Sequence, residues 1–215
     1  MLRPRVAVLV SGGGTNLQAL IDAQRGGLFR SGALALVVSS RAGAFALERA
    51  KQAGIDAETA DRAAFATQAA FEERLLAVLS AHRIDLIVLA GFLHILSPAF
   101  VGRYRGRIVN VHPSLIPAYC GKGFYGVKVH EAVLAAGEVE TGATVHMVDE
   151  VPDGGRILLQ KRVAVLPGDT PQTLQRRVME QAEWILLPRA VERLCAGWMQ
   201  QTERQGKTDE REELI

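Results

Sequence analysis

Near the middle of the chain, a short run of branched apolar residues contains an asparagine and a histidine two positions apart. Residues 107–114 read RIVNVHPS, and because alternate side chains of a strand share a face, Asn110 and His112 point the same way. Pro113 ends the strand, since it has no N–H to donate to a buried ladder. An amide and an imidazole therefore lie together at a strand's carboxyl end, where open α/β sheets build their sites. A hydrogen-bonded corner without chemistry is the alternative.

A glycine-rich turn joins the first apolar run to the helix expected after it. Residues 11–16 read SGGGTN; three glycines let the backbone approach a ligand closely, and a helix N-terminus offers free N–H donors to an anion. The G-x-G-x-x-G pattern of dinucleotide sites and the Lys-Ser/Thr pair of a Walker A loop are both missing, so a phosphate monoester fits better than NAD or ATP. A tight turn without a ligand is the alternative.

An apolar loop follows a later strand, where residues 90–98 read AGFLHILSP. Aromatic and aliphatic side chains just past a strand's end could line a flat apolar pocket, with backbone N–H and C=O groups left to bind the edge of a heteroaromatic ring. The same side chains would also serve as plain core.

An acidic turn, DEVPDGG, occupies residues 149–155. Asp before Gly-Gly is common turn chemistry, but a carboxylate beside His112 would stabilise an imidazolium and make it a usable acid near neutral pH. Asp153 is expected to be this carboxylate, because the glycines after it permit a close approach. No metal is expected, since the possible ligands lack a local spacing such as H-x-x-x-H; they are His112, His130, His146 and Asp149.

The elements that would position these residues alternate along the chain. Short β-branched runs bounded by Gly, Ser or Pro indicate buried parallel strands at 5–11, 33–40, 84–91 and 107–112. Helical spacing predicts helices at 16–25, 45–53 and 67–82. Later segments predict a helix at 129–136 and two antiparallel strands at 143–148 and 157–165. The series predicts an α/β fold, a Rossmann-like, doubly wound, mostly parallel sheet with an antiparallel carboxyl-terminal extension.

A long terminal helix is expected to open at Thr170-Pro171, with Thr170 as N-cap and Pro171 in the first turn. Its predicted inner stripe is Leu174, Val178, Ala182 and Ile185. From Thr202 to the end the sequence is charged and lacks a core face, which predicts a frayed tail over 202–215.

Composition narrows the class of protein. A chain of 215 residues with 48% hydrophobic content is long enough to bury one full core. A formal net charge of +2, with few aromatics and no basic cluster, does not indicate nucleic acid. No targeting segment is visible, and no apolar run approaches the ~20 residues of a membrane span. Cys120 and Cys195 lie far apart in sequence, which fits a reducing cytoplasm.

Six segments together, in their order and spacing, closely resemble the phosphoribosylglycinamide formyltransferases, folate-dependent enzymes of purine synthesis. They are SGGGTNLQALIDA, DLIVLAGFLHILSPAF, RIVNVHPSLIPAY, KVHEAVLAAG, TGATVHMV and DGGRILLQ. The resemblance implies one formyltransferase domain over residues 1–201, with a phosphate-binding half (1–106) and a catalytic and folate-binding half (107–201). The implied reaction moves the formyl group of 10-formyltetrahydrofolate to the amine of glycinamide ribonucleotide, giving formylglycinamide ribonucleotide and tetrahydrofolate.

The resemblance also assigns roles to positions. The implied catalytic residues are Asn110, His112 and Asp153, with protonated His112 and the Asn110 amide stabilising an oxyanion while Asp153 holds His112. The implied nucleotide-binding residues are Gly12, Gly13, Gly14, Thr15, Asn16, Pro113 and Glu183. The implied folate-binding residues are Phe92, Leu93, His94, Ile95, Leu96, Asn110, Asp149, Glu150, Val151, Pro152 and Asp153. The expected partners are these two small molecules, without nucleic acid or membrane, and the chain is expected to be a monomer or a homodimer.

The sequence departs from the family pattern at two positions. His94 stands where many members have arginine, and Gln68 falls near a position often occupied by an arginine that reaches the glutamate tail of folate, so the affinity for that tail is expected to differ. The glycine-rich loop 120–126 is longer than in some members and is expected to be a mobile flap. The alternatives are a formyltetrahydrofolate deformylase or methionyl-tRNA formyltransferase activity on the same sheet, and a non-catalytic module that binds a nucleotide.

Overall fold

The computed structural model describes the backbone of residues 3–212 and the side chains of residues 3–200. Within that part of the chain a seven-stranded sheet has the order β3-β2-β1-β4-β5-β6-β7. The parallel strands are β1 (Arg5–Val10), β2 (Ala33–Ser39), β3 (Asp56–Thr59), β4 (Leu86–Leu89) and β5 (Ile108–His112), and the antiparallel ones are β6 (Glu140–Met147) and β7 (Ile157–Ala164). The predicted fold class is confirmed.

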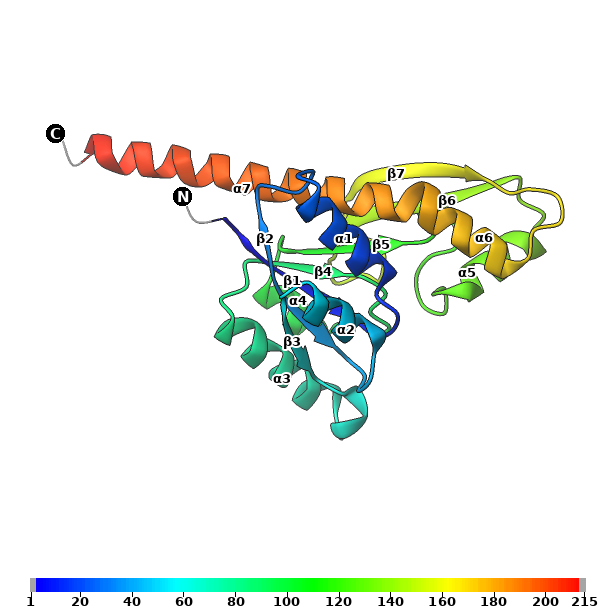
Figure 1. Ribbon diagram of the computed structural model, residues 1–215, viewed down its shortest axis with the longest axis horizontal. Helices are drawn as coiled ribbons and strands as arrows, with labels where there is room; N and C mark the ends of the chain where they lie inside the picture. The colour runs from blue at the N-terminus through cyan, green and yellow to red at the C-terminus, as the bar shows by residue number, and fades with distance from the viewer. Residues whose placement is uncertain (1–2, 213–215) are drawn as a thin grey trace.

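Helices cover both faces of the sheet (Figure 1). They are α1 (Thr15–Arg25), α2 (Phe45–Gln52), α3 (Gln68–Ala81), α4 (Pro98–Arg103), α5 (Val127–Ala135), α6 (Pro171–Val178) and α7 (Trp184–Glu212), with short helices at Arg62–Ala64 and Met179–Glu183. Alternate side chains of β1 divide between two cores. Val6, Val8 and Val10 pack on the face of α1, α6 and α7, whereas Ala7 and Leu9 pack on the face of α3 and α4.

Strand β3 has no counterpart in the sequence prediction. Its residues read DAET, and all but Glu58 are exposed. An edge strand needs little apolar surface, because only one neighbour pairs with it. Hydrophobic patterning therefore carries no signal for this strand.

The terminal helix differs from the prediction in its middle. Met179–Glu183 forms a π-helical turn between α6 and α7, and such a turn adds one residue to the helical repeat. As a result Ile185 is only half-buried, and the apolar stripe continues through Leu186 and Leu187 instead.

The backbone of residues 202–212 continues α7 instead of fraying, and residues 213–215 of the predicted tail lie outside the described residues. In Figure 1 the last turns of α7, in red, project past the sheet. Extending an existing helix avoids the cost of nucleation, and Glu, Arg, Lys and Gln are good helix formers. None of the helices in residues 3–212 is long and apolar enough to cross a bilayer.

Strand order reverses between β1 and β4, which lie side by side in the middle of the sheet. Ligands of open α/β sheets bind in the crevice outside the carboxyl ends of the strands at such a reversal. The glycine loop (residues 12–16) follows β1, the loop 91–97 follows β4, and Asn110 and His112 end the neighbouring strand β5. The topology therefore brings the three predicted site segments to one edge.

Candidate active site

The register between β5 and β6 gathers the polar side chains of the site. Asn110 lies directly opposite His146, and His112 lies opposite Thr144. Directly opposed residues of an antiparallel pair project to the same face, so Asn110, His112 and His146 share one face. The Nδ2 atom of Asn110 is 3.2 Å from Nε2 of His146.

Asp153 reaches this face from the loop between β6 and β7. Its φ of 56° is left-handed, a conformation that Asp tolerates better than most residues. The loop lies so close to β6 that a Cβ on Gly155 would be 1.9 Å from the carbonyl oxygen of Met147. The predicted close approach through the glycines after Asp153 is thus present in the structure.

The Asp153 carboxylate lies between two imidazoles. Its Oδ2 is 3.5 Å from Nδ1 of His112, and its Oδ1 is 3.4 Å from Nε2 of His146. The backbone N–H of Gly121 donates a 2.8 Å hydrogen bond to Oδ2. Burial alone would raise the pKa of Asp153, but the contacts with His146, His112 and Gly121 outweigh it, so that the pKa lies below its usual value.

Two contacts define the protons of His112, which is 4% exposed. Its Nε2 is 2.8 Å from the carbonyl oxygen of Tyr119, and because a carbonyl only accepts hydrogen bonds, Nε2 carries a proton. Its Nδ1 faces the Asp153 carboxylate, which also only accepts. Both ring nitrogens therefore face groups that only accept hydrogen bonds.

His146 is a site residue that the sequence analysis considered only as a disfavoured metal ligand. It is 1% exposed, and its Nδ1 donates to the carbonyl oxygen of Met147 at 2.8 Å. That bond fixes the ring orientation, so Nε2 faces Asn110 and Asp153. Only its position on a strand two residues from an expected turn gave a signal in the sequence.

A second buried imidazole, His130 of α5, lies outside this cluster of hydrogen bonds. It is fully buried, and neither ring nitrogen has a hydrogen-bond partner among the described residues. Burial, with a smaller contribution from the charge of His112, lowers its pKa to about 4. His130 is thus neutral at physiological pH. Within the described residues, no group of three or more His, Cys, Asp or Glu side chains has a geometry that would hold a metal ion.

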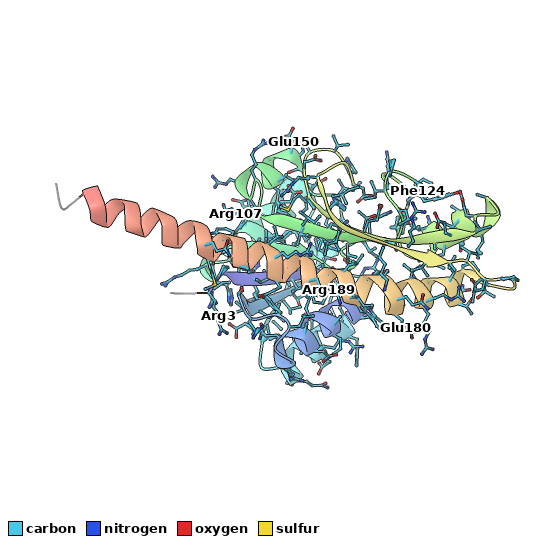
Figure 2. All side chains as sticks on the ribbon, turned by 90° about the horizontal axis from the view of Figure 1, so that it is seen from above. Arg3, Arg107, Phe124, Glu150, Glu180 and Arg189 are labelled. Carbon is cyan, nitrogen blue, oxygen red and sulfur yellow. The ribbon has the colours of Figure 1, made fainter. Side chains whose placement is uncertain are left out.

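A cavity of about 500 Å³ opens beside the cluster. Its wall contains Asn110, His112, Pro113, His146 and Asp153, together with most of the predicted folate-binding residues, namely Phe92, Leu93, His94, Ile95, Leu96, Asp149, Glu150 and Pro152. Val151 is not part of the wall and is 62% exposed. The glycine-rich segment 121–126 closes another side. In Figure 2, Phe124 and Glu150, both wall residues, lie on the same side of α7.

The acidic residues of the cavity wall have bonds of their own. Asp149 accepts the backbone N–H of Val151 at 2.9 Å, and Glu150 pairs with Arg105 at 3.0 Å on the surface. Asp149 therefore has a turn-forming role, which is the common role of an acidic residue in a turn.

The two positions that depart from the family pattern are both engaged within the protein. His94 packs edge-on against Phe71 and Phe92 at 5.5 Å between ring centroids. Burial lowers its pKa, and Arg62 and Arg41 lower it further, so the ring is neutral. The Nε2 of Gln68 donates to Glu72 at 2.8 Å and to the carbonyl oxygen of Ile95 at 3.0 Å.

The glycine loop lies outside the wall of the cavity. A Cβ on Gly14, whose φ is +70°, would lie 2.6 Å from Cβ of Ala46, so this position requires glycine. The guanidinium of Arg49 donates to the Gly13 carbonyl at 2.8 Å. Gly12 and Gly13 are exposed, and a Cβ there would meet nothing within 4 Å. The loop is thus held from α2 while its outer surface stays open.

The predicted nucleotide-binding residue Glu183 meets the same loop from the π-helical turn. The Nδ2 of Asn16 donates a 2.6 Å hydrogen bond to Glu183, and both residues are buried. Burial raises the pKa of Glu183 to about 7, although the hydrogen bond from Asn16 opposes the shift. The Oδ1 of Asn16 is buried and has no hydrogen-bond partner among the described residues.

These features define an α/β protein with an acid–base cluster between a glycine loop and an apolar cavity, and comparison with known sequences gives its class. The chain belongs to the formyl transferase family, which it matches over residues 4–191. It is 43% identical over 176 residues to phosphoribosylglycinamide formyltransferase of Escherichia coli (strain K12), an alignment that covers 82% of this chain and 80% of that protein. The family resemblance inferred from the six segments is confirmed.

Two further similarities concern longer relatives and solved structures. The chain is 45% identical over 196 residues to the trifunctional purine biosynthetic protein adenosine-3 of Drosophila melanogaster, which covers 91% of this chain but only 14% of that protein. It superposes on glycinamide ribonucleotide transformylase 1 from Symbiobacterium toebii with a TM-score of 0.84 and 39% identity, covering 91% of this chain and 89% of that one.

Proposed function

We propose that this protein transfers the formyl group of 10-formyltetrahydrofolate to the amine of glycinamide ribonucleotide, giving formylglycinamide ribonucleotide and tetrahydrofolate. The observation that carries the proposal is the cluster of Asn110, His112 and Asp153 in the wall of the cavity. The names of the E. coli and Symbiobacterium relatives support the same reaction.

The two substrates would approach the cluster from different sides. The phosphate of the nucleotide would bind the open surface of the glycine loop, where the N-terminal N–H groups of α1 are free to donate. Asn16 and Glu183 would contact the rest of the nucleotide. The pterin end of the folate would occupy the cavity beside the loop 91–97, whose backbone groups bind the edge of a heteroaromatic ring.

The chemistry begins when the substrate's free amine attacks the formyl carbon. A C–N bond forms, and the formyl oxygen becomes an oxyanion. The Asn110 amide and the protonated His112 donate to that oxygen, and each such donor is worth roughly 3 to 4 kcal/mol in the transition state. When the bond between the formyl carbon and N10 of the folate breaks, the proton lost by the amine passes to N10, with Asp153 assisting through water.

One main-chain contact changes in this scheme. The Nε2–H of His112 now donates to the Tyr119 carbonyl, so donation to the oxyanion requires that bond to be exchanged for one to the substrate. Tyr119 leads into the glycine-rich segment 121–126 of the cavity wall. The predicted mobility of this flap would permit the exchange.

The proposal is tested with purified protein and 10-formyltetrahydrofolate, with and without glycinamide ribonucleotide. We expect folate release to require the nucleotide and to match, mole for mole, the formylated nucleotide found by mass spectrometry. Release at the same rate without the nucleotide would instead identify a deformylase, and formylation of methionyl-tRNA a tRNA formyltransferase. Tight nucleotide binding without turnover would indicate a non-catalytic module.

His112→Ala and Asn110→Ala serve as the inactive variants in that assay. Each should retain the wild-type circular dichroism spectrum and lose nearly all turnover, because each removes one donor to the oxyanion. The cytoplasmic location and the monomeric or homodimeric state stay predictions of the sequence.

A further inference from the structure

Ser11 is the last residue before the glycine loop, and its hydroxyl is committed to two other segments. It is 2% exposed. Its Oγ accepts the backbone N–H of Leu93 at 2.9 Å and lies 2.7 Å from Oγ of Ser40, the residue after β2. Its own N–H donates to the Gly91 carbonyl at 3.1 Å. Ser11 thus extends the pairing of β1 and β4 beyond the ends of both strands.

These bonds connect the two predicted substrate sites through one side chain. Gly12, whose open surface is offered to the phosphate, is covalently next to Ser11. Leu93 lines the cavity proposed for the folate, and its backbone N–H donates to the Ser11 hydroxyl. A change in the orientation of the glycine loop can therefore reach the loop 91–97 through a covalent bond and one buried hydrogen bond.

The far end of the loop 91–97 is held by a different group, the buried carboxylate of Glu72 on α3. It accepts the backbone N–H of Ser97 at 2.7 Å and the hydroxyl of Ser97. It also accepts Gln68, which in turn donates to the Ile95 carbonyl. The loop 91–97 is consequently held at one end by Ser11, which adjoins the glycine loop, and at the other end by Glu72, which does not.

We propose that Ser11 is a positioning residue that couples the two substrate sites, so that nucleotide bound at the glycine loop orders the loop 91–97 and tightens the binding of reduced folate. This inference rests on the proposed function for the identity of the ligands. The coupling acts through the Ser11–Leu93 hydrogen bond, and the net worth of one such bond limits the effect to about two- to tenfold in affinity. Linkage makes the effect reciprocal, so folate tightens nucleotide binding by the same factor.

The test uses tetrahydrofolate and glycinamide ribonucleotide, which carry no formyl group to transfer and so form a ternary complex at equilibrium. Titration calorimetry measures the Kd of tetrahydrofolate with and without saturating nucleotide, and the ratio of the two values is the coupling factor. We expect a factor of about two to ten for the wild-type chain and a factor near one for Ser11→Ala.

Two matched variants separate a loss of coupling from a general weakening of the loop 91–97. Ser40→Ala removes the other partner of the Ser11 hydroxyl at an equally buried position and should keep the wild-type factor. Glu72→Gln loosens the far anchor, so it should weaken folate binding with and without nucleotide and also keep the factor. If Ser11→Ala does not fold, Ser11→Cys keeps the volume with a much weaker acceptor and gives the same reading.

Three outcomes decide the matter. A wild-type factor of one, or an unchanged factor in Ser11→Ala, overturns the coupling and leaves formyl transfer untouched. Coupled binding without turnover overturns the proposed function but supports the link through Ser11. A wild-type chain that binds neither ligand overturns both.

Discussion

The Nδ2 atom of Asn110 lies 3.4 Å from Oδ1 of Asp153, and because a carboxylate only accepts hydrogen bonds, this contact sets which way the Asn110 amide faces. Nε2 of His146 is 3.2 Å from the same Nδ2 and 3.4 Å from the same Oδ1. The three atoms form a nearly equilateral triangle, so Nδ2 of Asn110 and Nε2 of His146 both lie against the same oxygen of Asp153. An amide nitrogen carries two N–H groups, and in the proposed reaction the second one, which is not directed at Asp153, donates to the oxyanion.

The first prediction concerns the worth of that second N–H. Asn110→Ala should lower kcat by about 10²- to 10³-fold with little change in either KM, because the donor acts mainly in the transition state. Steady-state kinetics with both substrates checks this. His146→Ala should lower kcat by about tenfold, since it removes one of the two neighbours that orient the amide.

The double variant separates orientation from other roles of His146. If His146 acts through Asn110, its removal from the Asn110→Ala protein should cost less than about threefold, as expected for coupled residues. Equal effects of His146→Ala in both backgrounds would contradict an action through Asn110. Thermal melting of all four proteins shows whether loss of the buried ring also destabilises the fold.

A second prediction tests how Asp153 is held against β6. Gly155→Ala places a Cβ where the Met147 carbonyl oxygen is only 1.9 Å away, so the loop must move and take Asp153 with it. We expect a loss of roughly 1 to 3 kcal/mol in stability together with a large loss of kcat. Denaturant unfolding and kinetics measure the two effects.

Gly102→Ala is the matched control for that substitution. Gly102 lies in α4, is exposed, and would place its Cβ in open space. Alanine there should raise stability by about 0.5 kcal/mol through helix propensity and leave kcat unchanged. Wild-type activity in Gly155→Ala would show that Asp153 does not depend on the close approach.

The sequence predicted those parts of the site that depend on local chain geometry. Asn110 and His112 share a face because side chains alternate along any strand. Gly14 and Asp153 lie in turns that their glycine-rich local sequence reveals. His146 joins them only through the register of two strands that are far apart in sequence. Pairing of that kind is decided by the packing of whole strands, so no short motif announces it.

The Tyr119 carbonyl on His112 illustrates a different limit. Every residue carries the same backbone carbonyl, and its place depends on how the segment after β5 turns, with Tyr119 itself at a φ of 52°. The π-helical turn that presents Glu183 is a third case, because its residues MEQAE are ordinary helix formers. In each case the decisive term is tertiary packing.

A third prediction distinguishes two kinds of glycine in the loop after β1. Gly14→Ala should destabilise the protein by about 1 to 2 kcal/mol, because its left-handed φ disfavours a side chain, and should also raise the KM of the nucleotide. Gly12→Ala should leave stability unchanged, since its Cβ would meet no protein atom within 4 Å, yet still raise the KM of the nucleotide. Melting temperatures and the two KM values give the reading; an unchanged nucleotide KM in Gly12→Ala would remove the phosphate from this loop.

The last prediction is a pH dependence of stability that originates at Glu183. Burial raises its pKa from 4.5 to about 7, so between these values the folded protein holds a proton that the unfolded chain has released. Stability should therefore fall by at most ~3 kcal/mol as pH rises from about 4.5 to 7, and it should stay level above pH 7.

Glu183→Gln keeps an acceptor for Asn16 without the charge, so it should be more stable than wild type at pH 8 and equally stable near pH 4. Glu180→Gln, on the exposed side of the same turn, should change neither value by more than about 0.5 kcal/mol. A Glu183→Gln curve parallel to wild type from pH 4 to 8 would contradict the prediction, because it would show that the pKa of Glu183 does not change on folding.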